Sequence, residues 1–296
     1  MNTVSNTSTD TRDLLWTSGW DSTFRLLSAL LLEDAHVRPH YVTDPARPST
    51  EAELKAMASI RSAIAEQYPG AAERLMPTQH AHRDEIPTIP MTRRRFASLA
   101  ARGEIGSQYE WLARYAASVG LVDLELAIHF DDKAHVFLQG HVEPIRYRST
   151  TVYRLTDAAA RTDLALFERF SFPVFDVTKR DMQRLAAENG FLDILELSWF
   201  CHTPLAGQPC GTCGPCNDAI REGVGYRLPP VGRLRNRVSQ VLPLRQIASS
   251  AKRLLRPAGG SSDRPVATPG ATPAPTGVSL RATAVRPAPQ TDGGVH

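Results

Sequence analysis

Residues 13–27 carry the sequence DLLWTSGWDSTFRLL. The apolar run at 13–17 is bounded by a turn that contains Gly19, which predicts a buried strand. From Ser22 to Asp34 apolar side chains recur at helical spacing, so we expect a helix after the turn. Backbone N–H groups of such a turn, together with the N-terminus of the next helix, form a site for phosphate groups.

Three residues of this turn suit a phosphate ligand. Gly19 permits close approach of the backbone, and Ser22 and Thr23 place hydroxyl groups at the start of the helix. The structural alternative is that Asp21 or Ser22 is an ordinary helix N-cap. These residues alone leave both interpretations open.

Further along the chain, short apolar runs alternate with helical patterns. Strands are expected at 37–42, 74–78, 123–128 and 172–177, and helices at 50–68, 108–119 and 178–189. Thr50 and Glu53 form a capping-box pattern, and Gly190 is expected to end the last helix. Residues 79–106 are expected to form an irregular loop with one helical piece, and 131–163 show no clear pattern. The alternation predicts an α/β fold with a doubly wound parallel sheet.

Composition is typical of a globular protein. The 296 residues are 42% hydrophobic and 22% charged. A net charge of +3 is too mild to argue for a nucleic-acid partner. No stretch approaches the roughly 18 apolar residues needed for a transmembrane segment, and the polar N-terminus lacks the order of a signal peptide. We therefore expect a cytoplasmic protein, in which cysteines are more often metal ligands or catalysts than disulfides.

All four cysteines lie in one window, CHTPLAGQPCGTCGPC, with the spacing C-x8-C-x2-C-x2-C. Glycine and proline between them suit tight turns that let thiolates converge on one ion. Four thiolates leave no open position, which predicts a structural zinc ion held by Cys201, Cys210, Cys213 and Cys216. The alternatives are unrelated thiols or disulfides, and an iron–sulfur cluster, because C-x2-C-x2-C also begins ferredoxin-type runs.

Both ends of the 13–224 region resemble one family of ATP-using enzymes. The segment TSGWDS at 17–22 is similar to the S-G-G-x-D-S loop of the PP-loop ATP pyrophosphatases, or adenine nucleotide alpha-hydrolases, with Ser18 in place of the first glycine. The later segments resemble 7-cyano-7-deazaguanine synthases in particular. The matching positions are Asp176, Thr178 and Lys179 of a D-x-T-K segment, Glu196, Leu197 and Trp199 of an E-L-T-W segment, and the four cysteines.

The middle of the chain departs from that family. Ser107 and Gln108 stand where the family has an R-N pair. Of the family's G-x-N-x-x-D segment only Asp132 matches, with Ala127 and His129 in place of the glycine and the asparagine. The resemblance therefore implies that the ATP-binding loop and the zinc site are those of the family. The pocket that recognises the acceptor substrate is expected to differ from the family's.

The resemblance implies an enzyme that binds ATP with Mg²⁺ and activates a carboxylate of its substrate. The carboxylate attacks the α-phosphate to give an acyl-adenylate and pyrophosphate. In the family, ammonia then attacks the adenylate, and a second ATP activates the amide to leave a nitrile. The expected partners are accordingly a small heterocyclic acid and ammonia or another amine.

The same resemblance implies roles for single residues. The nucleotide-binding candidates are Thr17, Ser18, Gly19, Trp20, Ser22 and Thr23. Lys179 would reach the leaving phosphates as a point charge, and Asp21 would shape the turn or hold Mg²⁺ through water. Asp132, Gln108 and Trp199 are the candidates for substrate recognition.

Alternatives to this function stay open. The enzyme could join the acyl group to another amine or to a protein acceptor. It could also be a non-catalytic nucleotide-binding module, in which the side chain of Ser18 crowds the phosphates. Sulfur transfer to RNA is disfavoured, because no cysteine remains after the metal site. A homodimer is left open as the assembly state.

The expected organisation has four parts. They are a disordered lead-in at 1–12, a PP-loop ATP-binding domain at 13–225 with its zinc knuckle at 198–217, a basic helical extension at 226–256, and a disordered Pro/Ala/Gly-rich tail at 257–296. The extension could dock on an anionic membrane or on nucleic acid. We favour a solvated helix that packs on the domain, because Pro243 interrupts irregularly spaced apolar positions.

Overall fold

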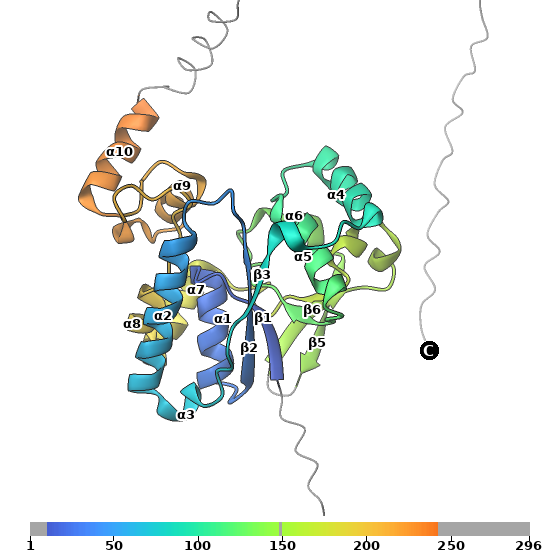
Figure 1. Ribbon diagram of the computed structural model, residues 1–296, viewed down its shortest axis with the longest axis horizontal. Helices are drawn as coiled ribbons and strands as arrows, with labels where there is room; N and C mark the ends of the chain where they lie inside the picture. The colour runs from blue at the N-terminus through green and yellow to red at the C-terminus, as the bar shows by residue number, and fades with distance from the viewer. Residues whose placement is uncertain (1–10, 148–149, 242–296) are drawn as a thin grey trace, which may run out of the picture. The chain divides into compact units, whose positions relative to one another are not determined.

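The computed structural model describes residues 11–147 and 150–241 (Figure 1). Thr11 and Arg12, predicted to belong to a disordered lead-in, are part of the first strand instead. The predicted tail at 257–296 lies outside the described residues, as does the part of the basic extension beyond residue 241. No helix in the described ranges is long and apolar enough to cross a membrane.

A five-stranded sheet organises the chain, and every neighbouring pair of its strands is parallel. The strands are β1 (Thr11–Leu15), β2 (His36–Thr43), β3 (Gln79–His82), β4 (Leu124–Glu125) and β7 (Phe170–Ser171), in the order β3-β2-β1-β4-β7. The chain builds outward from β1 in one direction and then restarts at β4 in the other. Doubly wound sheets open a crevice at such a switch point, outside the carboxyl ends of the strands.

Helices cover both faces of this sheet, as the sequence predicts (Figure 1). One layer contains α1 (Trp20–Leu31), α2 (Thr50–Gln67), α7 (Lys179–Glu188) and α8 (Leu192–Glu196), and the other contains α4 (Pro90–Arg102), α5 (Gln108–Ser118) and α6 (Lys133–Leu138). Successive residues of β1 point to opposite faces, so Leu14 packs in the first apolar cluster and Leu15 in the second.

The remaining elements are short. They are α3 (Pro69–Ala72), the antiparallel pair β5 (Val142–Tyr147) and β6 (Thr150–Leu155), α9 (Gly214–Arg221), α10 (Pro230–Val241), and the 3-10 turns η1 (Arg83–Glu85), η2 (Ala159–Arg161), η3 (Asp163–Phe167) and η4 (Gly225–Arg227). The β5–β6 hairpin and α6 occupy the region in which the sequence shows no clear pattern.

Two predicted strands are wrong in position. The third strand forms at 79–82 rather than 74–78, where Leu75 makes an isolated bridge to Val37. Residues 172–177 are mostly turns, and the strand there is only β7, just before them. Phe172 pairs instead with Tyr153 of the hairpin. The apolar side chains of residues 172–177 are buried by packing against other aromatic rings. A turn can bury them in this way as well as a strand can.

The other local differences concern β4 and the start of α2. β4 pairs over two residues, against the 123–128 predicted. The capping box predicted from Thr50 and Glu53 does not form, because Ser49 is the N-cap of α2. The Glu53 carboxylate accepts hydrogen bonds from the hydroxyl groups of Ser49 at 2.6 Å and Tyr41 at 2.8 Å. Glu53 therefore ties α2 to β2 rather than capping its own helix.

A buried network of four charges joins β1, α1 and β4. Arg25 donates to the Glu125 carboxylate at 2.6 and 2.8 Å, and it also pairs with Glu33. Arg12 lies 3.3 Å from Glu125 and 3.4 Å from Glu33. Burial raises the pKa of Glu33, but the hydrogen bonds and positive charges of its partners, chiefly Arg25, together lower it below its ordinary value of 4.5. Glu33 therefore adds stability above that value, and this stability is lost as the pH falls through the lowered pKa.

Candidate functional site

The loop between β1 and α1 turns at Ser18, whose backbone has a φ of 54°. This left-handed conformation favours glycine, the residue that the resembled loop has at this position. The Ser18 carbonyl accepts a hydrogen bond from the backbone N–H of Trp199 at 2.8 Å. The Ser18 hydroxyl is fully buried and, among the described residues, has no hydrogen-bond partner. Its side chain therefore points into the protein.

Gly19 is the N-cap of α1, and no side chain caps this helix within the described part of the chain. A Cβ atom at Gly19 would lie 3.3 Å from the Thr17 hydroxyl, so glycine keeps the loop compact. The Ser22 hydroxyl accepts from the Thr17 N–H at 3.4 Å and donates to the Gly19 carbonyl at 3.3 Å. Neither Asp21 nor Ser22 is the N-cap, which excludes that alternative. The first-turn N–H groups of α1 are donors of the kind that bind anions.

The six loop candidates divide into two groups. Thr17, Gly19, Trp20 and Ser22 line a cavity, whereas Ser18 and Thr23 do not. Thr23 is fully buried, and its hydroxyl accepts a hydrogen bond from the Trp16 indole N–H at 3.1 Å. The structure therefore gives Thr23 a partner in the core rather than a place at the cavity.

The cavity lies at the switch point of the sheet and has a volume of about 430 Å³. Its walls include the β1–α1 loop, the end of β2 and the segment after β4. The first residues of α5 and α7, one side of α9 and the segment before the cysteines complete them. The predicted residues that line it, apart from those of the loop, are Asp21, Gln108, Asp132, Lys179 and Trp199. Predicted residues that are far apart in the sequence, from Thr17 to Trp199, thus meet at one site of a size that suits a small ligand.

Lys179 lines this cavity and pairs there with two carboxylates. It is the first residue of α7, after the N-cap Thr178, which forms a capping box with Asp181. The Lys179 ammonium lies 2.7 Å from the Glu222 carboxylate and 3.7 Å from that of Asp21. Burial lowers the pKa of Lys179, but the nearby carboxylates, Asp21 and Glu222 with Asp218, together raise the pKa above its ordinary value. Lys179 is therefore a fixed positive charge that faces the cavity.

Asp21 and His129 form a second contact across the switch point. The His129 Nε2 atom lies 3.8 Å from the Asp21 Oδ1 atom, which is buried and without a hydrogen bond among the described residues. The His129 Nδ1 atom accepts from the backbone N–H of Asp131 at 3.2 Å, so a neutral ring carries its proton on Nε2. His129 thus presents an N–H toward Asp21.

Asp132 is held by its neighbours at the edge of the cavity. It is the N-cap of α6 and accepts from the Ala134 N–H at 2.7 Å and from the Tyr109 hydroxyl at 3.2 Å. Burial is the main cause that raises the pKa of Asp132, and the nearby charge of Asp21 adds to it. The hydrogen bonds from Ala134 and Tyr109 both end on the Oδ1 atom and fix the carboxylate, so its Oδ2 atom takes part in neither of them.

Sequence reasoning missed Glu222, Tyr109 and Arg227, which also line the cavity. The Arg227 guanidinium lies over the ring of Trp20, at 4.9 Å from its centroid, and over that of Phe200, at 5.1 Å. None of these residues belongs to a motif. Their place in the site comes from tertiary packing, so no local pattern could have found them.

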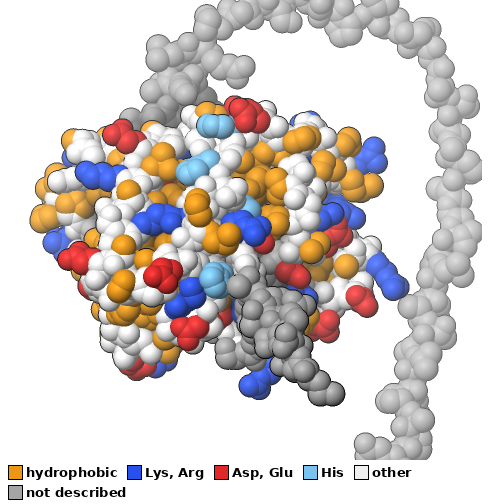
Figure 2. Space-filling view, turned by 60° about the horizontal axis from the view of Figure 1, so that its bottom comes forward, with side chains coloured by type: hydrophobic (Ala, Val, Ile, Leu, Met, Phe, Trp, Pro, Cys, Tyr) orange, Lys and Arg blue, Asp and Glu red, His pale blue; other side chains and the backbone are white. Residues whose placement is uncertain are grey.

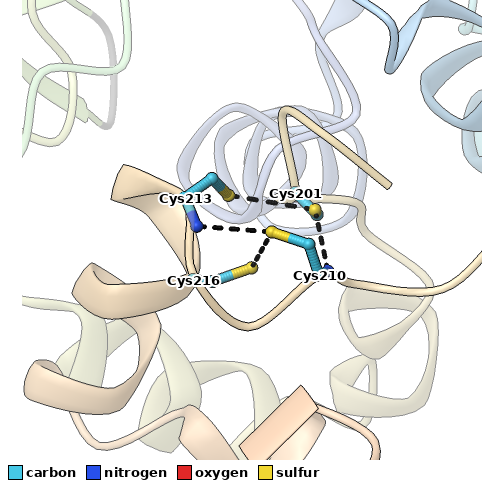
Figure 3. A group of neighbouring side chains, drawn as sticks. All are labelled: Cys201, Cys210, Cys213 and Cys216. Carbon is cyan, nitrogen blue, oxygen red and sulfur yellow. Dashed lines mark hydrogen bonds between the residues drawn. The ribbon is translucent and has the colours of Figure 1, made fainter. Parts of the chain in front are cut away.

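The four cysteines converge, as predicted, in a cluster that can bind a metal ion such as zinc (Figure 3). Their sulfur atoms all lie within 4.8 Å of one another, with Cys201–Cys213 at 3.8 Å and Cys210–Cys216 at 3.9 Å. Four thiolates about 2.3 Å from one zinc ion would lie roughly 3.8 Å apart. These separations are far too long for disulfides, which excludes that alternative for the described fold.

Backbone and side-chain donors surround the cluster. The Cys201 sulfur accepts from the Cys210 N–H at 3.2 Å, and the Cys210 sulfur accepts from the N–H groups of Thr212 and Cys213, both at 3.3 Å. The Thr203 hydroxyl adds a fourth donor at 3.4 Å from Cys210. Donors of this kind orient metal ligands and stabilise thiolates.

One helix connects the cysteine cluster to the cavity. Cys213 is the N-cap of α9, and Cys216 lies in its first turn. The cavity-lining residue Asp218 is on the same helix, and Glu222 is its C-cap. Anything that holds the cysteines in place therefore also holds the carboxylate that pairs with Lys179.

The strain at Ser18 leads to a stability prediction. We expect Ser18→Gly to stabilise the fold by about 0.5–1 kcal/mol, because it relieves the left-handed strain and removes an unpaired buried hydroxyl, offset in part by the greater freedom of glycine in the unfolded chain. Urea unfolding measures the change. Ser18→Ala, which keeps the Cβ atom, is the control and should stabilise less; a glycine variant that is less stable than wild type contradicts the prediction.

Comparison with the models of known protein families returned no match, and a comparison with curated proteins returned none either.

Proposed function

We propose that the chain is an ATP-dependent ligase that adenylates the carboxylate of a deazaguanine-like heterocyclic acid for amide or nitrile formation. One observation carries the proposal: the β1–α1 loop, Lys179 and the cavity meet at the switch point of a doubly wound sheet. Such sheets bind nucleotides at this point, and the loop offers its uncapped helix N-terminus to the phosphates.

The proposed nucleotide end uses the loop, Lys179 and two unpaired polar atoms. The Trp20 Nε1 donor and the Asp21 Oδ1 acceptor are buried beside the cavity without a hydrogen bond among the described residues. Buried polar atoms are normally paired, so both fit a site that a ligand completes. Asp21 would hold Mg²⁺ through water, and Mg²⁺ would neutralise charge on the phosphates.

The proposed acceptor end uses Asp132, Gln108 and Trp199. The Asp132 carboxylate can accept the N–H groups of a purine-like ring through the oxygen that its own bonds leave unused. The Trp199 indole N–H donates to the Cys201 carbonyl at 2.7 Å, which fixes the ring and leaves its face for stacking. His129 and Gln108 differ from the resembled family and would adapt the pocket to its own acid.

In the proposed reaction the protein acts by position and charge. A carboxylate oxygen of the acid bonds to the α-phosphorus, the bond from that phosphorus to the bridging oxygen breaks, and pyrophosphate leaves with its electron pair. Lys179 and the loop N–H groups hold the leaving phosphates. The walls of the cavity hold the two reactants in contact, which lowers the entropic part of the barrier. The amine that then attacks displaces AMP.

The proposal includes a structural zinc ion on the four cysteines. The donor set is all sulfur and closed, with separations that match a tetrahedral ion. Zinc would stabilise the fold around α9 and take no part in the reaction. An iron–sulfur cluster is the alternative for the same ligands, and the two differ in visible absorbance.

Incubation of the full chain with ATP, Mg²⁺, 7-carboxy-7-deazaguanine and ammonia tests the function. We expect mass spectrometry to show AMP together with the amide or the nitrile. AMP that forms with the acid but without either product indicates another amine as the acceptor, which the altered Gln108 and His129 would explain. ATP binding without AMP in the presence of a panel of heterocyclic acids identifies a non-catalytic module and rejects the ligase.

Crowding by Ser18 does not support the non-catalytic alternative. That alternative requires the side chain of Ser18 to crowd the phosphates of a bound nucleotide. In the fold, Ser18 is fully buried and does not line the cavity. Calorimetry with ATP on metal-replete protein provides the second check, because absence of any binding removes every nucleotide-dependent function.

A further inference from the structure

Helix α10 packs on the cysteine cluster through its small and polar side. Gly232 and Asn236 are buried, and the Asn236 amide donates to the Gly211 carbonyl at 2.8 Å. The backbones approach so closely that a Cβ atom built on Gly211 would lie 2.0 Å from the Gly232 carbonyl oxygen. The side of α10 that faces the domain is therefore not apolar.

The apolar side of α10 is turned outward. Val231, Leu234 and Val238 are 44%, 60% and 43% exposed. Their i, i+3, i+7 spacing places them in one stripe along the helix. At roughly 100° per residue, this stripe lies on the side opposite to Gly232 and Asn236. An amphipathic helix normally buries such a stripe against its own domain, and here the domain leaves it uncovered.

Positive charge surrounds the stripe. Helical geometry places Arg235 and Arg237 on its two sides, and Arg233 lies further round. Within the described ranges, none of these three arginines forms an ion pair with an acidic side chain. Along α10 itself, from Pro230 to Val241, the sequence contains three Arg residues and no Asp or Glu. By contrast, acidic and basic side chains are interspersed on the face shown in Figure 2.

We infer that α10 docks the protein on an anionic lipid bilayer, with Val231, Leu234 and Val238 in the interfacial region and the arginines against the headgroups. A narrow apolar stripe bordered by arginines is the pattern of helices that lie in a membrane interface. Anionic lipids satisfy both parts of the surface at once. This docking is independent of the proposed ligase activity.

Two other occupants fit the surface less well. In a symmetric dimer each stripe would meet its own copy, so the arginines of one helix would face those of the other without acidic partners. Nucleic acid would satisfy the arginines, but its phosphates offer nothing to three exposed aliphatic side chains. Lipid is the partner that both the charge and the apolar stripe favour.

Co-sedimentation of the full chain with vesicles tests the inference. We expect binding to vesicles of phosphatidylcholine mixed with phosphatidylserine, weakened by salt, and little binding to phosphatidylcholine alone. Each basic residue near an anionic surface contributes roughly fivefold to partitioning, so Arg235→Gln with Arg237→Gln should weaken binding roughly 25-fold. Leu234→Ser with Val238→Ser should weaken it by at least about tenfold, because the side chains no longer leave water.

The control is a pair of valines elsewhere that are even more exposed than Leu234 and Val238. Val122 and Val136 are 67% and 74% exposed, and Val122→Ser with Val136→Ser should leave vesicle binding and the melting temperature unchanged. Equal binding to both vesicle types, or to neither, overturns the inference. Binding to duplex DNA that needs the arginines but not the stripe assigns the surface to nucleic acid instead. A dimer that dissociates in the Leu234→Ser, Val238→Ser variant, without lipid binding by wild type, assigns it to a second copy.

Discussion

Replacement of Cys213 by serine is expected to abolish metal binding and to unfold the C-terminal part of the domain. Cys213 is one of four convergent thiols and also the N-cap of α9. Binding of structural zinc contributes about 10–16 kcal/mol in small zinc domains, which equals or exceeds the whole stability of most proteins. Metal analysis should fall from about one zinc per chain to none. Thermal unfolding should show a lower melting temperature or no cooperative transition.

A graded control separates loss of the metal from general damage to the cluster. Thr203→Val keeps the four thiols and removes the hydroxyl that donates to the Cys210 sulfur. It should retain the metal with affinity weakened about 10-fold to 100-fold, as for other outer-sphere partners. A Cys213→Ser protein that melts like wild type shows that the cysteines do not hold a structural metal. Visible absorbance of the purified protein identifies an iron–sulfur cluster instead.

Replacement of Lys179 by methionine is expected to lower turnover about 10²-fold to 10³-fold, if the proposed reaction is present. Methionine keeps much of the length of the side chain and removes the positive charge that pairs with both Asp21 and Glu222. Without it the two carboxylates repel the phosphates, and the leaving group loses a preorganised partner. Pyrophosphate release measures the step directly.

The neighbouring arginine is the matched control. Arg180 follows Lys179 in α7 but is exposed and does not line the cavity. Arg180→Met should therefore retain turnover within about twofold, because exposed charges have small effects. Equal losses in both variants would mean that general positive charge on α7 matters rather than the position of Lys179. An active Lys179→Met protein rejects the assigned role.

Much of the fold follows from the sequence because it rests on local patterns. The apolar run before the β1–α1 loop and the helical spacing after it predict both elements within a few residues. The sequence does not predict the hairpin β5–β6, because Pro144 and the charged residues Glu143, Arg146 and Arg154 are typical of loop sequence. Residues 172–177 show the opposite error. Their apolar run reflects burial, and burial alone does not distinguish a strand from packed turns.

The candidate site was predicted where chemistry is encoded in spacing. The cysteines converge as their spacing predicts, and the loop lies beside Lys179 across the switch point. The exceptions have physical reasons. Thr23 lies one helical turn after the N-cap Gly19, and its hydroxyl accepts a hydrogen bond from Trp16 in the core instead of facing the cavity. Glu222 lies six residues after Cys216, where nothing in the sequence shows that the turn of α9 brings its carboxylate to Lys179.

The buried network of two arginines and two glutamates in the core also has a thermal consequence. The hydration of charged groups becomes less favourable as the temperature rises, so withdrawal of these charges from water is costliest in the cold. The stabilisation that buried apolar surface provides, by contrast, changes little as the temperature rises. On warming, ionic contacts therefore supply a growing fraction of the cohesion between β1, α1 and β4.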